Sequence, residues 1–107
     1  MATSRRFLLL DNGGETADRF TLYDTKPMKH GYFGTTVLYI GFSENPYHPQ
    51  GFGQHGETTV SQLRELKQEL RNKGSSNIGK VAKLKDLPEK AQKFAKSFMD
   101  SQLKDHP

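Results

Sequence analysis

The chain has 107 residues, no cysteine and a formal net charge of +4, so it is near the commonest domain size. We expect a single domain over residues 1–107, without disulfides, thiolate metal sites or cysteine nucleophiles. No segment approaches the roughly 20 apolar residues of a membrane-spanning helix. The four apolar residues after Arg6 are also fewer than the about 7–15 of an export signal. The sequence therefore predicts a cytoplasmic protein that does not bind membranes.

Three strands are predicted before residue 43. Residues 5–10 are apolar on both faces, which predicts a central strand, and residues 11–14 have the Asn and Gly content of a turn. Residues 19–23 alternate, with Phe20 and Leu22 on one face, and should form a hairpin with the first strand. Residues 35–42 are rich in β-branched and aromatic side chains and are also expected inside the sheet.

Residues 43–57 are predicted to form a long loop. This segment is dense in Gly, Pro, His and aromatic residues. Connections of that length in compact domains are usually functional or disordered. Its aromatic residues and two prolines argue against disorder, so we expect an ordered working surface.

Two helices are predicted in the second half of the chain. Thr59 and Gln62 have the spacing of a capping box, and Gly74 is a natural helix stop. The apolar stripe of this first helix consists of Val60, Leu63, Leu66 and Leu70. Asp86 is the expected N-cap of the second helix, with Pro88 in its first turn. One face of that helix carries Leu87, Ala91, Phe94, Ala95, Phe98 and Gln102, with the two phenylalanines expected as core pegs.

Between the helices, residues 78–84 allow a fourth strand at the edge of the sheet. The predicted fold class is therefore α+β, with a three- to four-stranded, mainly antiparallel sheet and two helices packed on one face.

The residues 43–57 loop is the predicted binding site, because polar side chains do not fill cores and aromatic residues make rigid anchors. We expect a non-catalytic module that recognises a protein or a small ligand, without a cofactor. No motif in the chain completes a catalytic site. The predicted ligand-binding residues are Ser43, Asn45, Tyr47, His48, Gln50, Gln54, His55 and Glu57.

Two alternatives stay open. His30, His48 and His55 could meet Glu57 around a divalent metal in a hydrolase, although their spacing matches no metal motif. Residues 1–57 have a net charge of −1 and residues 58–107 one of +5, which would suit non-specific nucleic-acid binding. The lysines that would contact phosphates are Lys80, Lys83, Lys85, Lys90, Lys93 and Lys96.

Overall fold

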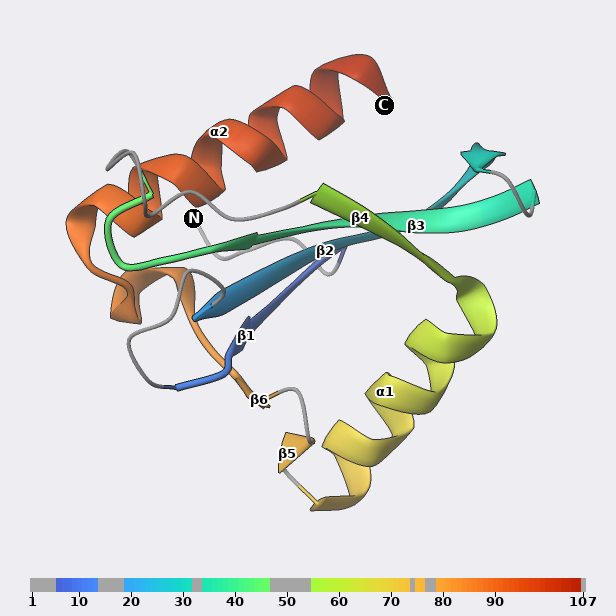
Figure 1. Ribbon diagram of the computed structural model, residues 1–107, viewed down its shortest axis with the longest axis horizontal. Helices are drawn as coiled ribbons and strands as arrows, with labels where there is room; N and C mark the ends of the chain where they lie inside the picture. The colour runs from blue at the N-terminus through green and yellow to red at the C-terminus, as the bar shows by residue number, and fades with distance from the viewer. Residues whose placement is uncertain are drawn as a thin grey trace.

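The computed structural model describes residues 6–13, 19–31, 34–46, 55–73, 75–76 and 79–106. Figure 1 shows a twisted sheet with one long helix on each side. The strand order is β4-β3-β2-β1-β6-β5, and every neighbouring pair is antiparallel. The strands are β1 (Phe7–Asp11), β2 (Phe20–Gly31), β3 (Gly34–Phe42), β4 (His55–Thr59), β5 (Ser75–Ser76) and β6 (Gly79–Val81). The helices are α1 (Val60–Lys73), the 3₁₀ turn η1 (Leu84–Asp86) and α2 (Glu89–Asp105). The predicted α+β class with a mainly antiparallel sheet is confirmed.

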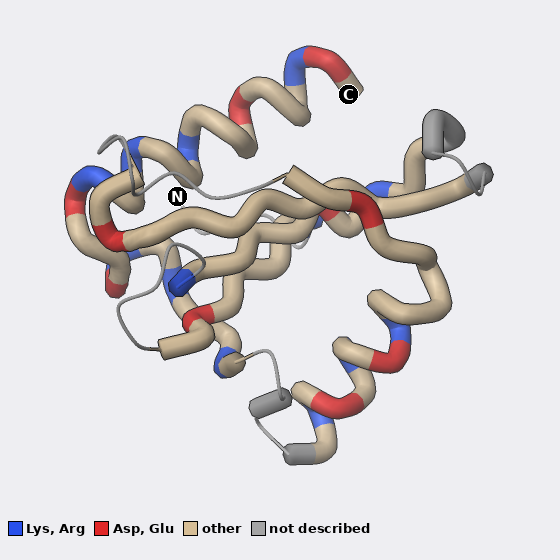
Figure 2. The backbone as a smooth tube through the Cα atoms, viewed as in Figure 1, with Lys and Arg blue, Asp and Glu red and all other residues tan. Residues whose placement is uncertain are grey.

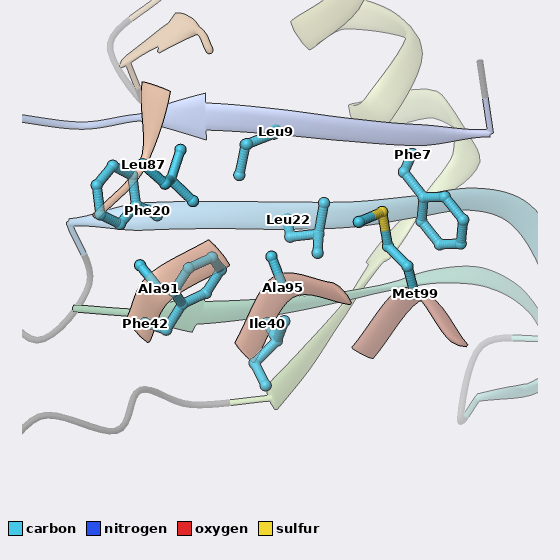
Figure 3. Close-up of a cluster of buried hydrophobic side chains, with 10 residues drawn as sticks. All are labelled: Phe7, Leu9, Phe20, Leu22, Ile40, Phe42, Leu87, Ala91, Ala95 and Met99. Carbon is cyan, nitrogen blue, oxygen red and sulfur yellow. The ribbon is translucent and has the colours of Figure 1, made fainter. Parts of the chain in front are cut away.

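The first core layer lies between α2 and one face of the sheet. Leu9, Leu22 and Ile40 point from successive strands toward Ala91 and Ala95 of the helix (Figure 3). The cluster is completed by Phe7, Phe20, Phe42, Leu87 and Met99. Phe94 and Phe98, the expected core pegs, pack against this cluster but are only half-buried. The two alanines, fully buried, take the central position because Phe20 and Phe42 of the sheet already fill that space.

The second core layer lies between α1 and the opposite face. Leu10, Tyr23 and Val37 of the sheet pack there against the apolar stripe of α1: Leu63, Leu66 and Leu70. Both helices were expected on one face, and that part of the prediction is wrong. Successive residues of a strand point to opposite faces, so Leu9 belongs to the α2 layer and Leu10 to the α1 layer. The doubly apolar β1 is central because it is covered on both sides.

Local signals placed the start of α1 correctly but misplaced the start of α2. The Gln62 amide donates to Thr59 Oγ1 at 3.1 Å, and Gln62 Oε1 accepts from the Thr59 amide at 3.4 Å, which confirms the capping box. Asp86 instead ends η1, and the first residue of α2 is Glu89. Leu87 is extended, with ψ 150°, because the residue before a proline is sterically excluded from helical geometry. Within the described residues, neither helix has the length and apolarity to cross a membrane.

The sheet has more strands than the three to four expected. Residues 55–57, predicted as the end of a loop, belong to β4 and pair with β3. The predicted strand in residues 78–84 is present as β6, but it pairs with β1, and the two-residue β5 lies outside it. Gly56 of β4 lies under the Tyr39 ring, and a Cβ at that position would clash with it. An aromatic ring that covers a cross-strand glycine compensates for the missing side chain.

A buried ion pair fixes the C-terminal part of α2 to the sheet. Arg6 contacts Asp24 in a bidentate manner, with Nε–Oδ1 at 2.7 Å and Nη2–Oδ2 at 2.8 Å. Gln102 of α2 donates to the same carboxylate at 2.8 Å, and the Lys26 amide donates at 3.1 Å. Arg6 also donates to the Gln102 carbonyl at 3.3 Å. Sheet and helix therefore share one hydrogen-bonded network.

Candidate functional site

A groove runs between one flank of α2 and the neighbouring strands β3 and β4. Its volume is about 370 Å³, and it is open to solvent. We call it the α2–β4 groove. It is lined by Leu38, Tyr39, Ile40, His55, Gly56, Phe94, Ser97, Phe98, Ser101, Gln102 and Asp105.

The strand register explains why His55 reaches this groove. His55 lies opposite Ile40, and Glu57 lies opposite Leu38. Directly opposed residues of an antiparallel pair share a face, and Ile40 belongs to the core layer under α2. His55 and Glu57 therefore project from the α2 face of β4, whereas Gly56 and Tyr39 lie toward α1.

The groove has an apolar body and a few polar groups. Leu38 and Ile40 come from the sheet, and Phe94 and Phe98 come from the helix. Ser97, Ser101 and Asp105 follow one another at four-residue spacing, so they form a polar line along one side of α2. Such a composition is typical of sites that hold an apolar ligand and orient it through hydrogen bonds.

The Arg6–Asp24–Gln102 network holds one end of the groove rigid. The Asp24 side chain is fully buried, and Arg6 is 15% exposed. Burial alone raises the pKa of Asp24, but the hydrogen bonds from Arg6, Gln102 and the Lys26 amide outweigh it and lower that pKa below its usual value. Asp24 is therefore an ionised structural group with its acceptors occupied, and we assign it no role in chemistry.

The predicted binding residues fall into two groups. Tyr47, His48, Gln50 and Gln54 lie outside the described residues, as does the side chain of His30. His55 and Glu57 are exposed on β4, and only His55 lines the α2–β4 groove. Although the register places Glu57 on the α2 face, the residue does not line the groove and instead borders a hollow between α1 and the sheet.

Ser43 and Asn45 lie at the other end of the loop, directly after β3. The Asn45 amide donates to Ser43 Oγ at 3.2 Å, which closes a tight turn. The Asn45 side-chain oxygen is buried and accepts no hydrogen bond. Buried acceptors of this kind are rare in native structures.

Sequence reasoning missed the α2 side of the groove. Phe94 and Phe98 were assigned to the core, and Ser97, Ser101 and Asp105 were not singled out. The available signal was the row of small polar residues that follows the two phenylalanines around the helix. That row indicates a side of α2 that is too polar to lie in the core and that adjoins the two half-buried phenylalanines.

The six candidate nucleic-acid lysines are all exposed, but acidic residues lie among them. They are distributed over β6, η1, α2 and the connection between the first two. Lys93 Nζ lies 3.6 Å from Glu89 Oε1, one helical turn away. Figure 2 shows red segments between the blue ones at this end of the molecule. The described charge pattern is therefore mixed, and nucleic-acid binding stays a prediction.

Two further hollows were compared with the groove. One, of about 410 Å³, lies between α1 and the sheet and is lined by residues that include Tyr23, Tyr39 and Gln62. The other, of about 500 Å³, lies where β1 meets β6 and is lined by residues that include Asp11, Lys80, Val81 and Asp86. The hollow between α1 and the sheet also combines two aromatic side chains with a residue predicted to bind, Glu57, whereas the hollow at β1 and β6 has no aromatic side chain. We select the α2–β4 groove because its lining joins three aromatic residues and His55 to a row of polar side chains on α2.

The metal hypothesis has no support from the described residues, among which no three His, Cys, Asp or Glu side chains could hold an ion together. His30 and His48 are outside that search, so their convergence with His55 stays a prediction. In comparisons with known proteins, no family model, no curated protein and no solved structure matches the chain.

Proposed function

We propose that the protein is a non-catalytic cytoplasmic binding module whose ligand occupies the α2–β4 groove. One observation carries the proposal: an open groove of about 370 Å³ combines Phe94, Phe98 and two aliphatic residues with His55 and a polar line on α2. Ligand sites commonly have volumes of about 300–1,000 Å³ and this kind of lining. The absence of cysteine supports the cytoplasmic assignment.

The groove favours a small ligand with a flat apolar body and a positively charged or donor group. The half-buried rings of Phe94 and Phe98 offer apolar contact. Asp105 lies in the last turn of α2, and the carbonyl groups at a helix C-terminus favour cations. An aromatic amine satisfies both ends of the groove, whereas an aromatic carboxylate would face Asp105.

The loop contributes the second part of the proposed site. His55 links the loop directly to the groove, and Asn45 brings an unused buried acceptor at the other end. Tyr47, His48, Gln50 and Gln54 are proposed as further ligand contacts on the basis of their residue types.

The test is a titration of ¹⁵N-labelled protein with tryptamine, with indole-3-acetate as the matched anionic probe. We expect saturable amide shifts at Ser97, Ser101 and His55 with tryptamine, and weaker or absent shifts with the acid. Ser101→Trp should fill the groove and abolish the shifts, whereas Ser61→Trp, at an exposed position of α1, should preserve them. Equal shifts in both variants, or none at millimolar tryptamine, would remove this proposal.

A further inference from the structure

Strand β4 forms one end of the sheet, and its chemistry differs from that of the opposite end. The other terminal strand, β5, has two residues, which leaves little backbone for a partner strand. β4 has five residues and contains neither lysine nor proline. Short length, lysine and proline are the usual means by which proteins prevent pairing at sheet edges. Within the described part of the chain, β4 pairs with a strand on one side only.

The sequence of β4 is self-complementary about Gly56. A second strand that ran antiparallel, with its own Gly56 opposite this one, would place the partner's Glu57 opposite His55. The same pairing would place the partner's His55 opposite Glu57. Both residues project from the α2 face, as the register with β3 shows, so each cross-strand pair would bring an imidazole to a carboxylate.

We propose that two copies of the chain associate through β4, antiparallel about a two-fold axis at Gly56. The two sheets then become one continuous sheet, with both α2 helices on the same face. A side chain at position 56 would project to the α1 face, where the Tyr39 ring lies, so glycine leaves room for the ring at the axis. The Tyr39 ring, which already covers Gly56 on the α1 face, would cover the paired glycines from each side.

Other registers are disfavoured by the same residues. A register shifted by one residue would pair a residue from the α2 face of one copy with a residue from the α1 face of the other. The two α2 helices would then lie on opposite sides of the joined sheet. Pairing Glu57 with the partner's Glu57 would set like charges directly opposite, which is destabilising. Pairing His55 with the partner's His55 would lose both imidazole–carboxylate contacts. Only the register centred on Gly56 makes two such contacts.

The association would also complete the α2–β4 groove. His55 lines the groove of each copy, so the partner's Glu57 would lie at its rim. A negative charge there would strengthen the preference for a cationic ligand. This consequence depends on the proposed function, but the association itself does not.

The test is sedimentation equilibrium from about 10 µM to about 1 mM, a range in which weak association through a small interface is measurable. We expect the wild type to show a monomer–dimer equilibrium. His55→Glu should weaken dimerisation about tenfold or more, because it replaces two favourable cross-strand pairs with two like-charge pairs. The double variant His55→Glu/Glu57→His exchanges the two side chains, so each imidazole again lies opposite a carboxylate, and should restore the dimer.

Gln68→Glu is the control, because it also adds a negative charge, at an exposed position of α1, and should leave the equilibrium unaltered. Circular dichroism checks that each variant is folded. A wild type that stays monomeric to about 1 mM, or a dimer that His55→Glu leaves intact, would overturn the proposal. If the wild type dimerises but shows no amide shifts with tryptamine, the proposed function is refuted and the association is not.

Discussion

Removing Arg6 from the buried network should cost a large part of the stability of the fold. Arg6→Met retains most of the side-chain volume but leaves the fully buried Asp24 carboxylate without its charged partner. Loss of one member of a buried ion pair typically costs about 3–5 kcal/mol. A small domain has a total free energy of unfolding of about 5–15 kcal/mol, so the variant should be folded but markedly less stable.

The pH dependence distinguishes this explanation from a simple packing defect. In the wild type the pKa of Asp24 is lowered, so its contribution is complete above the usual carboxyl pKa of about 3.9 and is lost as the pH falls toward the lower folded value. In Arg6→Met, loss of the hydrogen bonds and charge of Arg6 should raise the pKa of Asp24 relative to the wild type, while Gln102 and the Lys26 amide still donate to the carboxylate. Less stability should then be lost as the pH falls, so the slope of stability against pH should be shallower than in the wild type.

Urea unfolding followed by circular dichroism, from about pH 3 to pH 8, measures both effects. Lys26→Met is the matched control: Lys26 is exposed, and its Nζ donates to the His106 carbonyl at 3.4 Å. That change should cost about 0–1 kcal/mol and keep the wild-type slope. A loss below about 1 kcal/mol in Arg6→Met, with an unchanged slope, would refute the assigned role of the ion pair.

Four other results are expected. Gly56→Ala should cost about 1–3 kcal/mol in urea unfolding, because its Cβ would clash with the Tyr39 ring; an unchanged midpoint would contradict the close approach. Thr59→Ala should cost about 1 kcal/mol by removing the hydroxyl that caps the Gln62 amide, and normal stability would show that the cap contributes nothing. Added zinc or chelator should leave the melting temperature unchanged, and one equivalent of bound metal lost in His55→Ala would revive the metal alternative. If the six exposed lysines bind nucleic acid, retention should fall steeply between about 50 and 200 mM salt, and no retention at the lower concentration would exclude that function.

The features that sequence predicted well depend on local chemistry. Thr59 and Gln62 satisfy each other's backbone groups within one turn, so no tertiary information was needed to place the start of α1. The alternation of Phe20 and Leu22 likewise fixed one face of β2. The placement of one helix on each face could also have been inferred from the sequence of β1. A strand with Leu9 and Leu10 both buried needs cover on both faces, which argues for one helix on each side.

β4 could not be predicted because its pairing with β3, and not its own sequence pattern, determines its strand geometry. His55–Thr59 has no alternating apolar pattern and contains a glycine, which disfavours strand. Its pairing with β3 depends on Tyr39, which comes from a distant segment and covers Gly56. His55 was identified as a site residue from its type, but its direction toward α2 follows only from this register.

The groove results from the sizes of the side chains that α2 and the sheet present to each other in the core. Phe20 and Phe42 project from the sheet with ring centroids 5.6 Å apart, so the helix above them presents the small side chains Ala91 and Ala95. Phe94 therefore cannot occupy the centre and packs at the flank, where its ring lies 5.2 Å from that of Phe42. The aromatic wall of the candidate site is thus a consequence of core packing. Sequence alone could not show it, because a phenylalanine on an apolar helix face has the same pattern whether it lies at the centre of the core or at its border.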